Sequence, residues 1–332
     1  MAQRIAIIGS GMAGLAASWF LGKSHQVTLF ERQPRIGIGA HSVQTPGGVV
    51  DVPLRVIYPG YYPELFALLA HAGVTVEPLD ACMGFSDQGQ RSYFRYRNFQ
   101  ALGRTMPWVT PGMWLQSTSR HILQDLVRFI WQTPAALQAG RLDNCTLGEY
   151  LTRGHYTPDF AERFLIPAFA GINTVGYQEV RDTPAQLIAQ YFTRDFLGSS
   201  VYRAVGGATA LAQVLSARVH CLQLQARIAG VRRGPRSVWI TLEDGSRHKF
   251  DAVVFATQAN QVGAMLQDAS AAEHAILQAV RYGNVRVVMH HDERLMPTSH
   301  ADWSPVNYLM SATWDRPMVS IWVNRLLPAY TH

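Results

Sequence analysis

Residues 5–14 read Ile5-Ala6-Ile7-Ile8-Gly9-Ser10-Gly11-Met12-Ala13-Gly14. An apolar run typical of a buried strand leads into three glycines with the spacing G-x-G-x-x-G, and the small residues that follow predict a helix. In this motif the first glycine permits a tight turn, the second lets phosphates approach the backbone, and the third lets the helix pack against the strand. The stretch therefore predicts a strand, turn and helix that bind a dinucleotide.

Glu31 supports this prediction through its position. It ends a second apolar strand about 20 residues beyond the glycines, where a carboxylate can accept hydrogen bonds from both ribose hydroxyls. The N-terminus of the intervening helix offers unpaired N–H groups and a positive dipole end to the phosphates. The charge of Glu31 would repel a 2′-phosphate, although the neighbouring Arg32 weakens that exclusion, so we expect NAD or FAD.

The residues after Glu31 resemble a motif of the FAD-dependent amine-oxidase-like oxidoreductase superfamily. The run is Glu31-Arg32-Gln33-Pro34-Arg35-Ile36-Gly37, which is similar to the acidic strand end, arginine and glycine of that superfamily. The resemblance implies that arginine and glycine backbone hold the FAD pyrophosphate. Members usually carry Gly-Gly, whereas this chain continues Gly37-Ile38-Gly39-Ala40-His41-Ser42. The resemblance also places Leu54 and Arg55 near the isoalloxazine ring.

The second half of the chain continues the same resemblance. Tyr202–Gly207 is similar to the Gly-Gly stretch before the second FAD segment, and Ala226–Val231 and Phe250–Thr257 resemble the strands that lie against adenine and return to the cofactor domain. The resemblance implies FAD as cofactor. The residues expected to bind it are Gly9, Gly11, Met12, Ala13, Gly14, Glu31, Arg32, Arg35, Gly39, Ala40, His41, Leu54, Arg55, Ile228 and Ala256.

The predicted fold is α/β, with a Rossmann-like FAD-binding domain interleaved with a mixed α+β substrate domain of the flavin amine oxidase type. We expect residues 1–80 and 201–268 to form the FAD-binding domain, and residues 81–200, with a helical insertion, and 269–332 to form the substrate domain. Strands are predicted near Val285–His291, Val306–Ser311 and Met318–Asn324. Relatives close their FAD site with a C-terminal Gly-Asp segment that has no match here, so we expect the natural chain to continue past His332.

The reaction implied by the resemblance is FAD-dependent removal of a hydride from a C–N bond of a small or hydrophobic substrate. Many relatives use a lysine on the strand that corresponds to residues 283–290, but this chain has Arg286 there, and a guanidinium cannot act as a base at ordinary pH. The catalytic residues therefore stay unassigned. Two alternatives remain open: a desaturase-like flavoenzyme acting on an apolar acyl or isoprenoid lipid, and a non-catalytic dinucleotide-binding protein.

Charge and composition bear on the partners. The net charge is +6, and Arg91, Arg95, Arg97 and Arg104 are interleaved with aromatic residues in a way that also occurs in single-strand nucleic-acid binders. The alternation equally fits a hairpin strand, which we favour, so no nucleic-acid partner is expected. The amphipathic stretch Ser119–Trp131 is expected to cover the core, and peripheral contact with a membrane is the alternative.

Neither metal chemistry nor secretion is indicated. The three cysteines form no C-x-x-C pair, and His290 and His291, adjacent on a predicted strand, would point to opposite faces and could not chelate an ion together. The first residues run directly into a strand pattern without the features of a signal peptide, so a cytoplasmic protein is expected. The expected partner is a small-molecule or lipid substrate, and the oligomeric state is not predicted.

Overall fold

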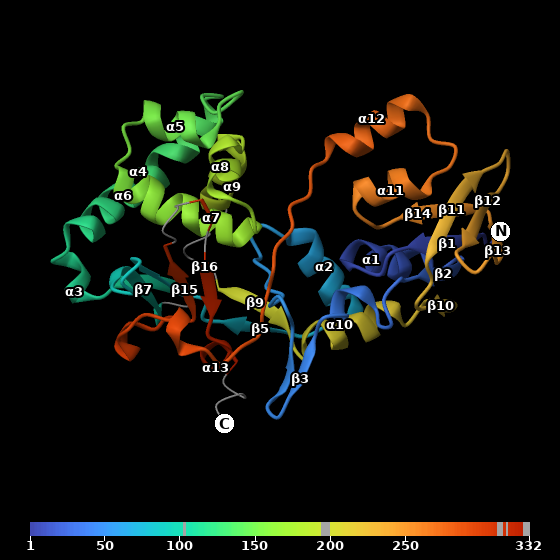
Figure 1. Cartoon of the computed structure of the whole chain (residues 1–332), viewed down its shortest axis with the longest axis horizontal. Helices are drawn as coiled ribbons and strands as arrows, with labels where there is room; N and C mark the ends of the chain where they lie inside the picture. The colour runs from blue at the N-terminus through green and yellow to red at the C-terminus, as the bar shows by residue number, and fades with distance from the viewer. Residues whose placement is uncertain (102–103, 194–199, 311–314, 317, 328–332) are drawn as a thin grey trace. The chain divides into compact units, whose positions relative to one another are not determined.

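The computed structural model describes residues 1–101, 104–193, 200–310, 315–316 and 318–327 (Figure 1). It divides into two compact units that share the chain in alternating segments. Unit 1 comprises residues 1–55, 64–77 and 203–284, and unit 2 comprises residues 56–63, 78–202 and 285–332. The predicted fold class is confirmed: a Rossmann-like α/β unit is interleaved with a mixed α+β unit.

A parallel sheet forms the centre of unit 1. Its strands lie in the order β10-β2-β1-β14, with bounds β1 Arg4–Ile8, β2 Gln26–Phe30, β10 Cys221–Gln223 and β14 Ala252–Phe255. Helix α1 (Met12–Leu21) connects β1 to β2, as a parallel pair requires. Ala6, Ile7 and Leu29 are fully buried, because both faces of these central strands are covered.

A three-stranded antiparallel sheet and several helices complete unit 1. The sheet has the order β11-β12-β13, with bounds β11 Ile228–Arg233, β12 Val238–Leu242 and β13 Arg247–Phe250. Its buried Ile240 and Phe250 form one core cluster with Phe30 of the parallel sheet. The other elements are η1 (Gly37–Gly39), β3 (Val43–Thr45), β4 (Gly48–Val50), α2 (Pro63–Ala72), α10 (Gly207–Ser216), α11 (Ala259–Met265) and α12 (Ala271–Ala279). The chain passes between the units in β5 (Val76–Leu79) and β9 (Val201–Ala204).

Unit 2 is a mixed sheet, and its helices between residues 117 and 193 gather on one side of it (Figure 1). The strand order is β16-β15-β6-β7-β8, with bounds β6 Met83–Ser86, β7 Ser92–Ala101, β8 Arg104–Val109, β15 Val306–Leu309 and β16 Met318–Ile321. The helices are α3 (Pro111–Trp114), α4 (Ser117–Gln138), α5 (Leu147–Arg153), α6 (Pro158–Phe160), η2 (Ala161–Leu165), α7 (Ile166–Asn173), α8 (Tyr177–Asp182), α9 (Ala185–Thr193), η3 (Glu293–Leu295), η4 (His300–Asp302) and α13 (Val323–Leu326). Aromatic rings fill the core, with Phe85, Phe129 and Phe160 almost completely buried.

Two segments lie in a different unit from the domain that the sequence predicts for them. Residues 269–284 were expected in the substrate domain but lie in unit 1, because the Arg233 guanidinium pairs with Asp268 and with Glu273 of α12. Residues 56–63 were expected in the FAD-binding domain but lie in unit 2. There Ile57 forms a β-bridge with Tyr202, and the Tyr61 ring stacks on the Tyr191 ring, with centroids 4.2 Å apart.

The strand predicted near Val285–His291 is wrong. Residues 281–290 have no regular structure and are exposed, with Val285 at 57% and Val288 at 57% of full exposure. The apolar alternation favours a strand, but no described strand hydrogen-bonds to this segment, and an unpaired strand is not stable. The strand predicted to end at Asn324 is also shorter, because β16 ends at Ile321 and the chain turns into α13.

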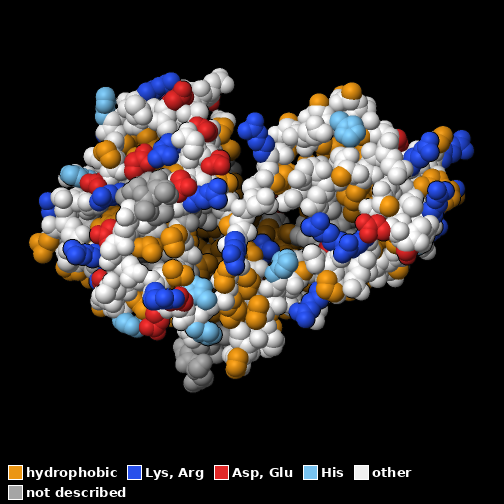
Figure 2. Space-filling model, in the orientation of Figure 1, with side chains coloured by type: hydrophobic (Ala, Val, Ile, Leu, Met, Phe, Trp, Pro, Cys, Tyr) orange, Lys and Arg blue, Asp and Glu red, His pale blue; other side chains and the backbone are white. Residues whose placement is uncertain are grey.

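The basic and aromatic run does form a hairpin strand, as predicted. Strand β7 pairs antiparallel with β8 over Tyr96–Ala101, and Arg95 forms an ion pair with Asp302 at 2.8 Å. On the visible face of unit 2, basic side chains are interspersed with acidic ones (Figure 2). Helix α4 buries Ile122 and Phe129 in the core. Within the described part of the chain, no helix combines the length and apolar character needed to cross a membrane.

Candidate dinucleotide-binding site

The turn after β1 requires glycine at the first and third glycine positions of the motif. Gly9 has a φ of +99°, and its N–H donates to the Phe30 carbonyl over 2.9 Å. A Cβ on Gly14 would lie 1.9 Å from the Gly9 carbonyl oxygen and 3.3 Å from the Ala256 Cβ. The turn, α1 and the end of β14 are therefore in such close contact that no side chain fits between them.

Gly11 differs from the other two glycines. A Cβ at Gly11 would meet no atom within 4 Å, so its position opens into free space. Gly11 is also the N-cap residue of α1, where no side chain caps the helix and no acidic residue occupies the first turn. The N-terminus of α1 thus offers N–H groups and a positive dipole end toward open space, which suits an anionic phosphate.

The carboxylate of Glu31 is buried and already strongly engaged. It is 6% exposed, accepts from Gln33 N–H over 2.8 Å, and accepts from both the N–H (3.1 Å) and the hydroxyl of Ser10. An ionised carboxylate has about four acceptor positions. Three of these positions are occupied, so Glu31 can accept a hydrogen bond from one ribose hydroxyl. For Glu31 to accept from both ribose hydroxyls, as expected from the sequence, the Ser10 hydroxyl must turn away.

Ser10 is a residue that sequence reasoning missed. Its fully buried hydroxyl donates to Glu31 and accepts from the Gly37 N–H over 2.6 Å, so it joins the glycine turn to the loop after β2. A Cβ on Gly37 would lie 2.6 Å from the Glu31 carboxylate, which leaves glycine as the residue that fits. Ser10 occupies an unspecified position of the motif, and the one available signal was a hydroxyl residue inside a buried turn.

Asp51 is a second missed residue. Its carboxylate, 4% exposed, accepts from the Ala208 N–H at the start of α10 (2.9 Å) and from the Ser42 hydroxyl (2.8 Å). Gly206 and Gly207 both have positive φ, and a Cβ on Gly207 would lie 2.9 Å from this carboxylate. Asp51 therefore caps α10 from a distant loop, and the Gly-Gly doublet makes room for it.

The structure brings only part of the predicted set together. Gly9, Gly14 and Ala256 are in contact, and Gly39 lies against Thr209 of α10. Ile228 packs on the core cluster that contains Phe30. The remaining predicted residues, by exposure, are Met12, Ala40 and Leu54, which are half-buried, and Ala13, Arg32, Arg35, His41 and Arg55, which are exposed.

Three exposed arginines and one exposed histidine lie close to this site in the sequence. For Arg32, Arg35, His41 and Arg55, the described part of unit 1 supplies no hydrogen bond or ion pair. The charges of the three arginines are therefore not neutralised by neighbouring carboxylates, which is compatible with an anionic ligand.

No catalytic base is identified among the described side chains. The two lysines of the chain are engaged elsewhere: the Lys23 ammonium lies 3.0 Å from His71, and Lys249 lies over the Trp239 ring. The strand expected to carry Arg286 is absent, and the described residues contain no cluster of three potential metal ligands among His, Cys, Asp and Glu. The catalytic residues remain unassigned.

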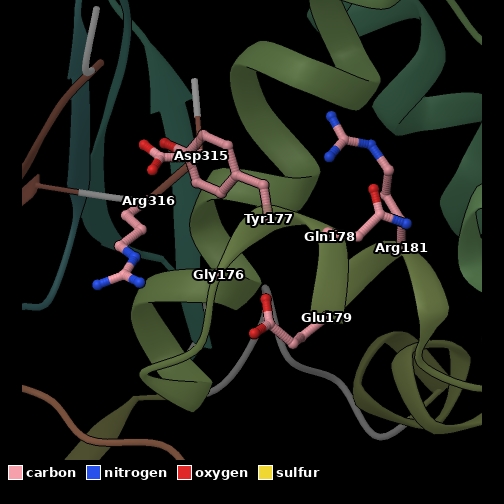
Figure 3. A pocket seen from close by; sticks show the side chains of 7 residues that line it. All are labelled: Gly176, Tyr177, Gln178, Glu179, Arg181, Asp315 and Arg316. Carbon is pink, nitrogen blue, oxygen red and sulfur yellow. The ribbon is translucent and has the colours of Figure 1, made fainter. Parts of the chain in front are cut away.

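Unit 2 also has an open polar depression of about 340 Å³ around α8 (Figure 3). Tyr177 donates its N–H to the Asp315 carbonyl, and burial, with the Asp315 charge, raises the pKa of the Tyr177 phenol to about 12. The guanidinium groups of Arg181 and Arg316 point in different directions, and Arg181 pairs with Glu162. These charges do not converge on one point, so the depression has no evident chemistry.

Comparison with known proteins supports the architecture. Residues 7–72 match the family of NAD(P)-binding Rossmann-like domains. No curated protein matches the chain. Among solved structures, similar ones include the fatty acid isomerase of P. acnes that produces CLA, with 18% identity, a TM-score of 0.59, and coverage of 83% of this chain and 63% of that one.

Two further structures are similar at the same level. Putrescine oxidase bound to putrescine has 15% identity and a TM-score of 0.58, covering 84% of this chain and 63% of that one. The PF1083 protein from Pyrococcus furiosus has 16% identity and a TM-score of 0.55, covering 84% and 66%. This chain spans about 63% of the length of the isomerase and the oxidase. At such identities the likeness shows the fold alone.

Proposed function

We propose that this protein is an FAD-dependent oxidoreductase whose unit 1 binds the ADP part of the cofactor. The observation that carries the proposal is the open α1 N-terminus at Gly11, with the buried Glu31 carboxylate fixed beside the turn by Ser10. The α1 N–H groups would hold the pyrophosphate, and Glu31 would accept from the ribose. When bound, FAD supplies an acceptor for a hydride.

The order of segments supports FAD rather than NAD. The loop of residues 37–51 is tied to α10 through Asp51, and β14 returns to the glycine turn at Ala256. Both features match the second cofactor-binding segment that the amine-oxidase-like superfamily has and a lone βαβ unit lacks. Arg32 and Arg35 would neutralise the pyrophosphate, and Leu54 and Arg55 would lie toward the flavin ring.

The first proposed substrate class is an amine, from which the enzyme would take a hydride at a C–N bond. The fold likeness to putrescine oxidase supports it. The second candidate is an apolar acyl or isoprenoid chain, reacting at a C–C bond. The likeness to a fatty acid isomerase favours this candidate, as do the exposed apolar residues of the amphipathic α4.

Two measurements test the proposal. First, FAD and NAD at equal concentrations are compared for the increase in melting temperature that they give, and the larger increase is expected with FAD because a ligand stabilises the state that binds it. Second, the FAD-loaded protein is mixed anaerobically with putrescine, benzylamine, oleate or linoleate, and loss of the visible flavin absorbance reports hydride transfer. Bleaching by amines supports the first class and bleaching by fatty acids the second. Bound FAD that no substrate reduces would indicate a non-catalytic binding protein, and stabilisation by NAD alone would contradict the FAD assignment.

A further inference from the structure

Unit 2 contains an apolar cavity between its helices and one face of its sheet. The cavity has a volume of about 190 Å³ and is lined by β6, β7, β8, α4, η2, α7 and α9. All the described residues that line it are apolar except Tyr96, and none is charged. Burial raises the pKa of the Tyr96 phenol, so this residue too is neutral at ordinary pH.

The cavity has a closed floor and an open mouth. Phe94, Leu165 and Phe169 are at most 1% exposed and form its interior, whereas Val127 of α4 is 55% exposed and Ile172 of α7 is 37% exposed. Protein cores rarely keep voids larger than a water molecule, because unfilled space is destabilising. An apolar space with buried residues on one part of its lining and exposed residues on another therefore fits a ligand that enters from the exposed part.

The volume of the cavity limits how much of a ligand it can bury. An apolar cavity of about 150 Å³ can hold a benzene molecule, so this one holds roughly six to eight carbon atoms. Drug-sized ligands occupy about 300 Å³ or more. A larger ligand would thus fill the cavity with its apolar end while the rest extends beyond Val127 and Ile172, and the chain of an amphiphile has this form.

The surface beside the mouth suits such a molecule. Trp131 follows Val127 by one helical turn and is 79% exposed, which is typical of a residue at the boundary between an apolar and an aqueous phase. Arg120 lies on the same helix face, seven residues before Val127. The one carboxylate of α4, Asp125, is 7% exposed and pairs with Arg128. Arg120 is therefore the α4 arginine without a carboxylate partner among the described residues, and its guanidinium donates to the Trp114 and Leu115 carbonyls.

We propose that this cavity binds the unbranched hydrocarbon chain of an anionic amphiphile, with the methyl end inside and the head group beyond the mouth on α4. The chain could come from a free fatty acid or from a lipid in a bilayer, since the buried chemistry is the same. The inference extends the second candidate function, but binding of the chain needs no flavin. It can therefore hold even if the oxidoreductase proposal fails.

The test is calorimetric titration with dodecanoate, in the presence and absence of FAD. Val127→Trp should obstruct the mouth without disturbing the core, because Val127 is exposed, and Ala168→Phe should fill the interior. We expect each to weaken dodecanoate binding at least tenfold. The matched control is Ile276→Trp, a similar change at an exposed position of α12 in unit 1, which should bind like the wild type.

Charge and source are tested in parallel. Dodecyltrimethylammonium should bind more weakly than dodecanoate, and equal binding would overturn the anionic preference. Co-flotation with phosphatidylglycerol vesicles that is reduced by Val127→Trp assigns the chain to a bilayer lipid, whereas dodecanoate binding without flotation assigns it to a free acid. Absence of dodecanoate binding by the wild type, or unchanged binding by a folded Val127→Trp protein, would overturn the proposal, whatever the flavin content.

Discussion

The two units build their candidate sites from different parts of the polypeptide. In unit 1 the dinucleotide site consists of backbone, glycines and two buried carboxylates, and a single added Cβ at Gly14 would collide with a carbonyl at 1.9 Å. In unit 2 the cavity is lined by apolar side chains from helices and strands, most of them aliphatic and five of them aromatic. A site made by backbone geometry restricts residue type at fixed spacing, whereas a site made by packing accepts many apolar residues.

The largest effect should follow from disrupting the aromatic packing of unit 2. Phe129 is 1% exposed, and its ring lies 5.0 Å from that of Phe192 and 5.7 Å from that of Phe160. Phe129→Ala should lower the free energy of unfolding by about 3–5 kcal/mol, since it leaves a cavity. Urea unfolding of this variant is compared with Phe99→Ala, whose ring is 48% exposed and which should change the value by less than about 0.5 kcal/mol. Equal effects would contradict the packing described for unit 2.

The glycine turn of unit 1 should be destabilised by adding a side chain, whereas the core of unit 2 is destabilised by removing one. Gly14→Ala places a methyl group against the Gly9 carbonyl, so we expect a loss of about 1–3 kcal/mol or more. Gly11→Ala adds the same methyl group in open space, so it should lower the melting temperature much less, since alanine at an N-cap costs about 1 kcal/mol or less. If both variants unfold at the same temperature in calorimetry, the close approach of α1 to the turn is wrong.

Removal of the distant cap of α10 should have a smaller effect. Asp51→Ala deletes acceptors for the Ala208 N–H and the Ser42 hydroxyl, which should cost about 1–2 kcal/mol. Ser42→Ala removes one of these hydrogen bonds and leaves the cap, so its cost should be about 1 kcal/mol or less. Denaturant unfolding measures both. A Ser42→Ala variant less stable than Asp51→Ala would show that the carboxylate does not stabilise the helix.

The smallest expected effect is a difference in thiol reactivity between the two units. Cys221 is exposed in unit 1, whereas Cys82 and Cys145 are buried in unit 2. Burial, reinforced by Asp80, raises the pKa of the Cys82 thiol to about 12, and burial also raises the pKa of Cys145. Because the thiolate is the reactive form, native protein at pH 8 should be labelled by iodoacetamide at Cys221 only, and at all three cysteines in denaturant. Rapid labelling of Cys82 in the native protein would show that the unit 2 core is open.

The same contrast explains what could be predicted from the sequence. The βαβ unit and the positions of Gly9, Gly14 and Glu31 were predictable, because the turn accepts few residues there. Ser10 and Asp51 were not, since their roles depend on Gly37 and Ala208, which only the folded chain brings near them. The strand prediction for residues 285–291 was wrong for a similar reason. The alternation of these residues indicates a strand, but a strand also needs a partner strand from elsewhere in the chain. The cavity of unit 2 has no sequence signal, since its apolar residues look like ordinary core positions.

In the proposed site the open N-terminus of α1 holds the pyrophosphate of FAD. The most direct measurement is the equilibrium affinity for FAD, by quenching of flavin fluorescence, in wild type, Gly11→Val and Gly112→Val. Both substitutions add the same side chain where a Cβ would meet no atom within 4 Å, but only Gly11 lies at the turn. We predict that Gly11→Val binds FAD at least tenfold more weakly while the protein without FAD stays folded, with a loss of about 1 kcal/mol or less at the N-cap, and that Gly112→Val binds like the wild type. A folded Gly11→Val protein with wild-type affinity for FAD would contradict the proposed site.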